Sequence, residues 1–324
     1  MTRLPQVVIL CPKEFKFTDH DATVERPFLN GVADLQTVWL DYEAAFPMAV
    51  IDADALILWH GPLITREVIT RMKNCRAIIR NGVGFDSVDT QAAAQAGIPV
   101  CNVPDYGTEE VADHAIALTL ALYRQLFPLD AVAKQLAWHI DVASRMRRLR
   151  SQTFGIVGLG RIGTAAALRA KAFGFRVVFF DPYAPSGTHK AIGIERVSTL
   201  DELLQIADTV SIHCPLTPET RGMIGAKQIA RMKPGSFLVN TARGDVVKKQ
   251  PVFAALHSGH LAGAGLDVVE AEPLRTREEA ATPNLIVTCH AAFCSPEGMV
   301  EMRSTSAKIA RAAVLGQPVW NRVN

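Results

Sequence analysis

The sequence of 324 residues lacks the features that mark secreted, membrane-spanning and nucleic-acid-binding proteins. Its six cysteines are scattered without a CxxC pair, which argues against a disulfide framework and favours reduced thiols. With 34 Lys and Arg against 32 Asp and Glu, no strong field would attract nucleic acid or an anionic membrane. The longest apolar stretches, such as residues 115–123, fall short of the roughly 20 residues of a membrane span. We therefore expect a soluble, cytoplasmic protein without nucleic-acid, membrane or metal partners.

The chain is longer than a usual single domain of roughly 100–200 residues, so two domains are expected. Short β-rich runs alternate with helical patterns, which is typical of parallel sheets covered by helices on both faces. A long helix is predicted over 109–126, with Thr108 as its N-cap. The predicted strands are 7–10, 37–40, 55–59, 77–80, 98–102, 154–157, 176–180, 208–213, 236–240, 262–266 and 285–289.

A glycine-rich turn is the strongest motif. Residues 153–163 read TFGIVGLGRIG, a short apolar strand that turns through Gly158, Gly160 and Gly163 into a helix. Backbone N–H groups at such a helix start can bind a pyrophosphate. The next apolar run, RVVFF, delivers Asp181, whose carboxylate can accept hydrogen bonds from both ribose hydroxyls and repel a 2′-phosphate. The pattern predicts a dinucleotide site that prefers NAD to NADP.

The position of this motif predicts the domain organisation. We expect a dinucleotide-binding domain over 107–295, inserted into a smaller domain made of residues 1–106 and 296–324. The helical segment from Pro296 is too short for a domain and should pack on the first one. The expected fold class is α/β, with two doubly wound parallel-sheet domains, a Rossmann-type NAD domain inserted in a flavodoxin-like substrate domain. Such an insertion would leave a cleft that can close on a substrate.

A cation, a carboxylate and an imidazole are expected at the carboxyl ends of strands in the second domain, where ligands bind in open α/β sheets. They are Arg243, Glu272 and His290. A guanidinium binds a carboxylate and polarises a carbonyl, an imidazole exchanges a proton with an oxygen, and a neighbouring carboxylate favours the imidazolium. Each residue alone would be as easily a surface ion pair or a helix cap. Together they favour hydride transfer to a 2-oxo acid.

On these motifs the chain resembles the D-isomer-specific 2-hydroxyacid dehydrogenase family, and most of all its branch with the C-terminal-binding proteins. The motifs that carry the resemblance are RNGVGFDSVD (80–89), VCNVPDYGTEEVADH (100–114), GIVGLGRIG, RAKAFGF with FFDPY, HCPLT (213–217), FLVNTARGDVV (237–247), GLDVVEAEP (265–273) and TCHAAF (288–293).

The resemblance implies roles for individual residues. It makes His290 the general acid/base, Glu272 its partner and Arg243 a substrate-binding cation. His213 would border the cofactor without reacting. The residues implied at the cofactor are Thr108, Gly158, Gly160, Arg161, Ile162, Gly163, Asp181, His213, Ala242 and Asp267. Those implied at the substrate are Arg80, Gly82, Val83, Gly84 and Phe293, with backbone N–H groups of residues 82–84 on the carboxylate.

Two departures from the related branch concern the pocket. Phe293 stands where those proteins have tryptophan, and Cys289 replaces a proline; we interpret Cys289 as a small buried residue. Arg80 matches the branch and offers a second cation, which favours small polar 2-oxo acids such as glyoxylate or hydroxypyruvate. The resemblance also suggests a two-fold homodimer around the helix 109–126.

Two other functions stay open at this point. An NAD-sensing corepressor-like scaffold would keep the same fold and bind partner peptides on its surface. Phosphoglycerate dehydrogenase is less favoured because no regulatory domain is expected after residue 324, and the scaffold is disfavoured because no long disordered tail follows the predicted catalytic histidine.

Overall fold

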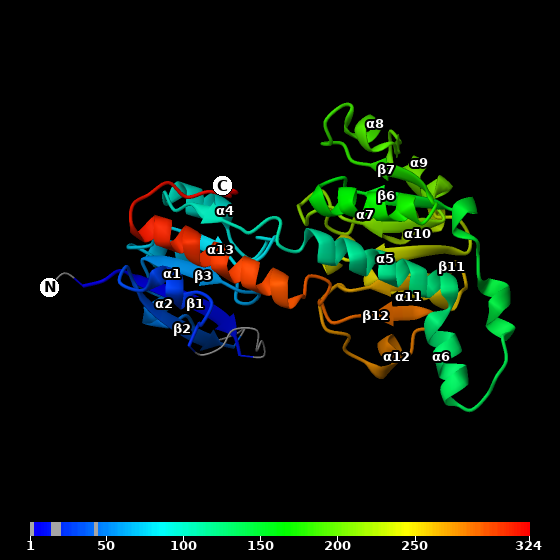
Figure 1. Ribbon diagram of the computed structural model, residues 1–324, viewed down its shortest axis with the longest axis horizontal. Coiled ribbons are helices and arrows are strands. Elements are labelled where there is room, and N and C mark those ends of the chain that lie inside the picture. Colours follow the sequence, from blue (N-terminus) through cyan, green and yellow to red (C-terminus); the bar gives the residue numbers. More distant parts are fainter. Residues whose placement is uncertain (1–2, 14–20, 42–44) are drawn as a thin grey trace. The chain divides into compact units, whose positions relative to one another are not determined.

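The computed structural model describes residues 3–13, 21–41 and 45–324, apart from the side chain of Val142. The chain divides into two compact units (Figure 1). Unit 1 consists of Met1–Gly107 with Cys294–Asn324, and unit 2 consists of Thr108–Phe293. Each unit contains one sheet whose paired strands are all parallel. The predicted α/β class with two parallel-sheet domains is confirmed.

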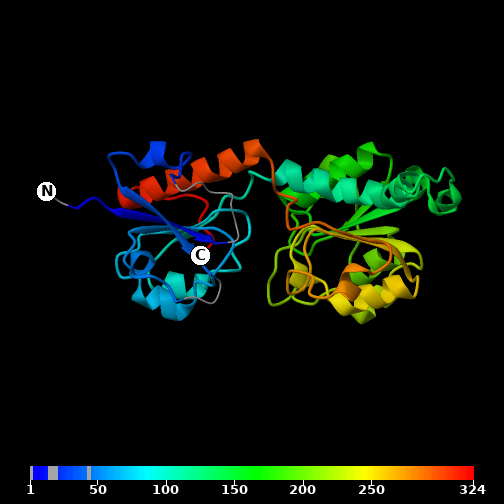
Figure 2. The same ribbon diagram turned by 90° about the horizontal axis from the view of Figure 1, so that it is seen from below.

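The sheet of unit 1 has the strand order β2-β1-β3-β4-β5, which is the flavodoxin-like order. Its strands are β1 (Gln6–Pro12), β2 (Asp34–Leu40), β3 (Ala55–Leu58), β4 (Ile78–Arg80) and β5 (Val100–Cys101). Its helices are α1 (Arg26–Leu29), α2 (Met48–Ile51), α3 (Arg66–Arg71), α4 (Thr90–Gln95) and α13 (Pro296–Val314). Figure 2 shows α1 and α13 on one face of this sheet and the remaining helices on the other.

A buried ion pair joins the two chain segments of unit 1. The Arg303 guanidinium on α13 donates from Nε and Nη2 to the two carboxylate oxygens of Glu25, both at 2.7 Å. Glu25 is 0% exposed and Arg303 is 7% exposed. Ser306, one turn further along α13, donates to Asn81 Oδ1 at 2.8 Å.

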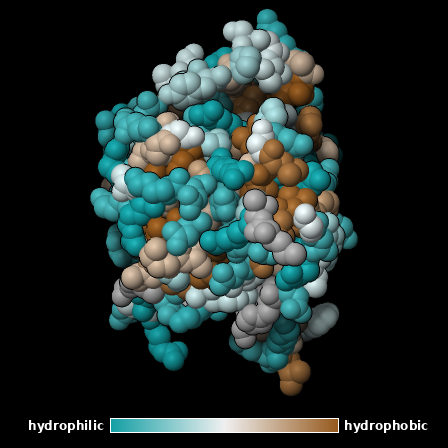
Figure 3. All heavy atoms as spheres, turned by 90° about the vertical axis from the view of Figure 1, so that its left-hand side faces the viewer, coloured by the Kyte–Doolittle hydropathy of each residue, from teal (hydrophilic) through white to brown (hydrophobic). Residues whose placement is uncertain are grey.

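Figure 3 looks onto the end of unit 1, where hydrophilic residues surround smaller hydrophobic areas.

The sheet of unit 2 has the order β12-β11-β10-β9-β6-β7-β8, the Rossmann order with one further strand. The strands are β6 (Thr153–Val157), β7 (Arg176–Phe180), β8 (Glu195–Arg196), β9 (Thr209–Ile212), β10 (Ser236–Asn240), β11 (Leu261–Leu266) and β12 (Leu285–Val287). The helices are α5 (Thr108–Arg124), α6 (Leu126–Lys134), α7 (Arg161–Ala172), α8 (Thr188–Ile192), α9 (Leu200–Ile206), α10 (Ala226–Arg231), α11 (Lys249–His257) and α12 (Arg277–Ala280). Three short 3₁₀ turns complete it: η1 (Asp141–Arg145), η2 (Leu149–Ser151) and η3 (Gly244–Val246).

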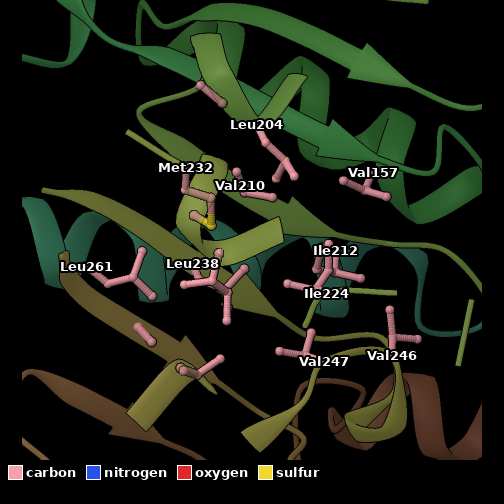
Figure 4. Packing of buried hydrophobic residues seen from close by; sticks show 14 of the residues in the cluster. Val157, Leu204, Val210, Ile212, Ile224, Met232, Leu238, Val246, Val247 and Leu261 are labelled. Carbon is pink, nitrogen blue, oxygen red and sulfur yellow. The ribbon is translucent and has the colours of Figure 1, made fainter. Parts of the chain in front are cut away.

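Both faces of the unit 2 sheet carry an apolar core because its strands are apolar at nearly every position. On one face, Val210 and Leu238 of the sheet pack with Leu204 of α9 and with Met232 (Figure 4). On the other face, the Tyr123 ring of α5 lies 4.7 Å from the Phe237 ring, centroid to centroid. This two-sided burial holds the strand ends rigidly, so the loops that follow them start from fixed positions.

All eleven predicted strands are present, with ends that differ by a few residues. The short edge strand β8 was not predicted. Two expectations are wrong. Thr108 does not cap α5: it is the first helical residue, and its buried Oγ1 has no hydrogen-bond partner among the described residues. Cys289 is exposed instead of buried, and it lies outside the strand, which ends at Val287.

Within the described residues, no single helix combines the length and apolar character needed to cross a bilayer. The pair α5 and α6 meets that test only together, and the two helices are bent by 60° where they join. The same part of the chain contains no group of three or more His, Cys, Asp or Glu side chains that could hold a metal ion.

Candidate active site

The three glycines of the turn after β6 are needed for three different geometric reasons. Gly158 has φ +94°, and a Cβ there would lie 2.7 Å from the backbone nitrogen of Cys214. A Cβ on Gly163 would lie 2.1 Å from the Gly158 carbonyl oxygen. A Cβ on Gly160 would meet no protein atom within 4 Å. Gly158 and Gly163 therefore allow the strand and the helix to pack closely. Gly160 instead leaves an open approach to the start of α7.

The Asp181 carboxylate lies beside this turn at the end of β7. Its Oδ2 accepts from the Leu159 amide at 2.8 Å, and its Oδ1 accepts from the amides of Tyr183 at 2.8 Å and Ala184 at 3.2 Å. The carboxylate therefore fixes the glycine turn and its own loop before any ligand is bound. Arg196 of β8 donates to the Asp181 carbonyl at 2.9 Å. This arginine was missed because β8 has no apolar pattern that would predict it.

His213 follows β9 and lies against the same turn: a Cβ on Gly163 would be 3.4 Å from its Cβ. Burial lowers the pKa of His213 to about 4, so the imidazole is neutral at physiological pH. Its Nε2 is 2.8 Å from the Ser211 hydroxyl. Its buried Nδ1 has no partner among the described residues, and neither does the buried Oγ1 of Thr241, which follows the next strand.

These features fit a dinucleotide. A bound ligand commonly supplies the partners of buried polar atoms such as His213 Nδ1 and Thr241 Oγ1. Arg161 and Ile162 are the first residues of α7, a helix whose N-cap Gly160 makes no side-chain capping bond. Their backbone amides are therefore suited to a pyrophosphate, which the helix dipole also favours. NAD would be held by this helix start, by Asp181 at the ribose, and by the strand ends around His213 and Ala242.

His290 and Glu272 form the expected pair. The Glu272 Oε2 atom lies 3.0 Å from His290 Nδ1, and the side chains are 39% and 22% exposed. The other oxygen, Oε1, accepts from the Val269 amide at 3.3 Å, which ties the carboxylate to its own loop. The Phe293 ring lies edge-on to the imidazole, with centroids 6.4 Å apart. The pair therefore has a defined orientation and still reaches the surface of unit 2.

His290 is held in a strained backbone conformation by Asp267. The residue has φ +54°, which is unfavourable for a residue with a side chain. Its amide donates to the Asp267 carbonyl at 2.9 Å. The Asp267 carboxylate accepts from the amides of Ala291 at 2.9 Å and Ala292 at 3.0 Å. Asp267 was predicted at the nicotinamide; in the structure its carboxylate, 2% exposed, supports the turn that carries His290.

Asn240 supports Arg243 in a similar way. The buried Asn240 side chain accepts from the Ala242 amide at 3.0 Å and donates to the Arg243 carbonyl at 2.9 Å. It closes the turn after β10, on which Arg243 is half-buried and donates from Nη1 to the Ala242 carbonyl at 2.8 Å. Asn240 was not predicted as a site residue, although it stands in the quoted motif FLVNTARGDVV.

The predicted substrate loop of unit 1 follows β4. Arg80 is 2% exposed; its guanidinium lies 3.0 Å from His60 Nδ1 and also donates to the Asn81 carbonyl. Because a guanidinium only donates, His60 Nδ1 is the acceptor in this bond. Gly82 has φ +145°, and a Cβ there would lie 2.6 Å from the Arg80 Nη1 atom. The carbonyl of Val83 accepts from Asn102 Nδ2 at 2.7 Å.

Each unit thus brings together its own part of the predicted site. Unit 2 brings His290, after β12, together with Glu272 and Asp267, after β11, and it brings the glycine turn together with Asp181 and His213 at the centre of its sheet. Unit 1 places Arg80 and the loop 82–84 at the end of β4. The catalytic, cofactor and substrate roles implied for these residues, and for Thr108, Ala242, Gly84 and Phe293, stay predictions.

Comparison with known proteins identifies the family. Residues 116–292, more than half of the chain and all within unit 2, match the family described as D-isomer specific 2-hydroxyacid dehydrogenase, NAD binding domain. The chain belongs to this family, and unit 2 contains its NAD-binding domain. The predicted family and the predicted cofactor, NAD, are confirmed.

Individual relatives cover most of the chain. C-terminal-binding protein 1 of Caenorhabditis elegans is 34% identical over 321 residues, covering 92% of this chain and 42% of the relative. D-3-phosphoglycerate dehydrogenase of Methanocaldococcus jannaschii is 36% identical over 273 residues, covering 84% and 52%. The chain thus spans about half the length of these relatives. The structure of D-lactate dehydrogenase from Aquifex aeolicus, complexed with NAD and lactic acid, matches with a TM-score of 0.86 and 30% identity, covering 95% and 96%.

Proposed function

We propose that the protein is an NAD-dependent dehydrogenase that interconverts a small 2-oxo acid and an (R)-2-hydroxy acid. The observation that carries this proposal is the His290–Glu272 pair, 3.0 Å apart, on the carboxyl edge of an NAD-binding sheet. The similarity to a D-lactate dehydrogenase that was crystallised with NAD and lactic acid supports it.

The geometry supports a distinct task for each side chain. NAD(H), held by the residues around the glycine turn, would supply the hydride transfer to or from C2 of the substrate. Glu272 accepts from His290 Nδ1, so Nε2 is the nitrogen that exchanges a proton with the C2 oxygen. In the reductive direction the imidazolium donates, and in the oxidative direction the neutral ring accepts. The Glu272 carboxylate stabilises the imidazolium between these steps.

Arg243 is the cation of unit 2 that is expected to bind the substrate carboxylate, and the N–H groups of the loop Gly82–Gly84 are the anion-binding groups that unit 1 offers. Arg243 is half-buried on a turn fixed by Asn240, so its guanidinium keeps a defined approach. Charge-assisted bonds favour an additional oxygen on the substrate more than apolar fit does, because one methylene contributes only about 1–3 kcal/mol. We therefore expect small polar 2-oxo acids such as glyoxylate and hydroxypyruvate to be preferred, and Phe293 to limit bulky substituents.

A panel of 2-oxo acids with NADH, followed by the loss of nicotinamide absorbance, tests this function. It should contain glyoxylate, hydroxypyruvate, pyruvate, phenylpyruvate and a dicarboxylate, each also with NADPH. We expect glyoxylate or hydroxypyruvate to give the highest kcat/KM, and NADH to exceed NADPH by at least about 10-fold because Asp181 repels a 2′-phosphate. No turnover of any acid would contradict the enzyme function, and equal rates with both cofactors would contradict the role of Asp181.

The 34% identity to C-terminal-binding protein 1 supports a second candidate, an NAD-dependent scaffold that binds protein partners. The same panel separates the two. A scaffold would bind NADH, as measured by nicotinamide fluorescence, and would reduce none of the acids at a useful rate.

We also propose that two copies of the chain form a homodimer through unit 2. Exposed apolar side chains gather on α6 and the segment after it, a composition that marks an interface. They are Leu126 (53% exposed), Phe127 (56%), Leu136 (97%), Trp138 (95%) and Ile140 (74%). Light scattering at micromolar concentration should give twice the 35.2 kDa of one chain. The double variant Leu136→Ser/Trp138→Ser should shift the mass toward the monomer, and a monomeric wild type would contradict the proposal.

A further inference from the structure

A histidine on α5 is connected to the turn that carries His290. The His114 Nε2 atom lies 2.9 Å from the Thr288 hydroxyl, although 174 residues separate the two in sequence. The Thr288 hydroxyl in turn donates to Asp267 Oδ1 at 2.5 Å. His114 Nε2 and Asp267 Oδ1 are 3.8 Å apart, which is within ion-pair distance but too long for a hydrogen bond. Thr288 is therefore the bridge between the helix and the carboxylate.

In this series of hydrogen bonds, the donor and the acceptor of each bond can be assigned in one way. An ionised carboxylate only accepts, so the single Thr288 proton is used on Asp267. The Thr288 oxygen must then accept from His114, which places a proton on His114 Nε2. The bonds run in one direction, from His114 through Thr288 to Asp267. Such a chain is strengthened by mutual polarisation of its members.

The end of the chain is the support of His290. Asp267 Oδ1 accepts both from Thr288 and from the Ala291 amide, while Oδ2 accepts from Ala292. Thr288 and Ala291 flank His290, whose φ is +54°. A strained conformation persists only where its surroundings fix it from several sides. Asp267 is 2% exposed, so a lost donor could not be replaced easily by water.

We infer that His114 is a positioning residue for His290, acting through Thr288 and Asp267. The inference rests on the proposed function, because it assumes that His290 handles the proton. His114 touches neither His290 nor Glu272 by any contact described above. Its effect is to hold the turn at the orientation in which His290 Nε2 meets the substrate oxygen. Helix α5 is anchored beneath the sheet by Ile116, Leu118 and Leu122, so the donor has a rigid base.

Two pairs of variants test this series of hydrogen bonds. In each pair, one variant removes the hydrogen bond and the other keeps it. Thr288→Val removes the hydroxyl at nearly constant shape, whereas Thr288→Ser keeps it. His114→Leu removes the donor, whereas His114→Gln keeps an N–H group at a similar distance along the side chain. Misplacement of a catalytic group by about 1 Å can cost on the order of 100-fold in rate. We expect Thr288→Val and His114→Leu each to lower kcat by about 10-fold or more, with Thr288→Ser and His114→Gln near wild type.

The double variant His114→Leu/Thr288→Val gives a further readout. If the two residues act as one chain, its loss of kcat should be close to that of the larger single loss and well below the product of both. Two control variants are matched to these changes. Thr119→Val removes a buried hydroxyl on the same helix, one that bonds to the Ala115 carbonyl and not to Thr288 or Asp267. His257→Leu replaces an exposed histidine at the end of α11.

Binding and stability measurements separate positioning from a general structural role. The Kd of NADH, measured by nicotinamide fluorescence, should stay within about 3-fold of wild type in all variants. Thr119→Val should leave kcat unchanged, whatever its effect on the Tm. Multiplicative losses in the double variant, losses equal in Thr288→Val and Thr288→Ser, or a kcat loss in Thr119→Val that matches Thr288→Val would overturn the inference.

The outcome for the wild type decides which proposal has failed. A wild type that reduces no 2-oxo acid contradicts the proposed function itself. An active wild type whose kcat is unchanged by Thr288→Val and His114→Leu contradicts only the positioning role.

Discussion

At the carboxyl end of the unit 2 sheet, the His290 and Glu272 side chains are 22% and 39% exposed. At the same end of the unit 1 sheet, Arg80 is 2% exposed, and its guanidinium is engaged by His60 and the Asn81 carbonyl. The edge of the unit 2 sheet thus presents titratable side chains that reach the surface. At the edge of the unit 1 sheet, the charged Arg80 side chain is buried and lies against the glycine loop that follows it. We expect the proton chemistry to come from unit 2, and we expect unit 1 to offer N–H groups that suit an anion.

The sharpest test of this difference is His290→Asn. If unit 2 supplies the chemistry, kcat should fall by about 10²–10⁴-fold, the contribution typical of a general acid/base. The Kd of NADH should stay near wild type because the glycine turn and Asp181 are untouched. Steady-state kinetics and fluorescence titration measure both. An active His290→Asn enzyme would remove His290 from the mechanism.

Glu272→Gln serves as the milder companion variant. Its amide keeps the size of the side chain but not the charge, so the imidazolium loses its stabilising neighbour. Steady-state kinetics should show a loss of kcat that is smaller than in His290→Asn, because the proton donor itself is retained.

The second largest effect concerns the interior of the unit 2 edge. The pKa of His213 is about 4 in the folded protein, against 6.5 as the ordinary value, because burial disfavours the charged form. The unfolded chain therefore binds more protons between these values. The contribution of His213 is fully present above about pH 6.5 and is lost as the pH falls toward 4, by at most about 3 kcal/mol.

Urea unfolding of the wild type and of His213→Asn between pH 4.5 and 7.5 measures this contribution. The variant should show a flatter dependence of its unfolding free energy on pH, whereas His257→Asn, an exposed control, should keep the wild-type slope. Equal slopes in wild type and His213→Asn would contradict the buried neutral imidazole.

A smaller effect is expected from substitutions in the glycine turn, where Gly160 concerns the approach of the ligand and Gly163 concerns the packing of the helix on the strand. Gly160→Ala should leave the Tm unchanged, since the added Cβ meets no protein atom within 4 Å. It should weaken NADH binding by about 10-fold because the methyl group occupies the approach to α7. Gly163→Ala is the contrasting variant, and it should impair folding because its Cβ would lie 2.1 Å from a carbonyl oxygen. An unchanged Kd in Gly160→Ala would place the dinucleotide elsewhere.

The smallest expected effect is a change of selectivity in unit 1. Arg80→Ala should reduce kcat/KM several-fold more for hydroxypyruvate than for pyruvate, because the second cation favours the additional oxygen. Equal losses for both acids, together with a lower Tm, would make Arg80 a structural residue and leave unit 1 without a charged role in recognition.

The sequence was sufficient to predict the strands and the glycine turn because both depend on local patterns. The buried strands 154–157 and 236–240 are nearly continuous apolar runs, and the glycines stand at a characteristic spacing. His290 and Glu272 could be paired because both follow strands that end at the same edge of the sheet.

The residues that hold the site depend on packing between distant segments, which no local pattern reports. His60 reaches Arg80 from the preceding strand, and His114 reaches Thr288 across 174 residues. A lone histidine on a helix gives no signal of such a contact. The prediction for Cys289 was wrong because it assumed a strand over 285–289, whereas the strand ends at Val287 and Cys289 lies exposed beyond it.

The buried pair between Glu25 and Arg303 has a consequence for the order in which the chain acquires its structure. Unit 2 is one continuous segment, Thr108–Phe293, and can fold as soon as it has left the ribosome. Unit 1 must wait, because the partner of Glu25 lies 278 residues later in the chain. Until α13 is synthesised, Glu25 has no Arg303 to neutralise it, and burying an unpaired carboxylate is strongly unfavourable. We therefore expect the first hundred residues to be the part of the nascent protein that most needs to be protected by chaperones.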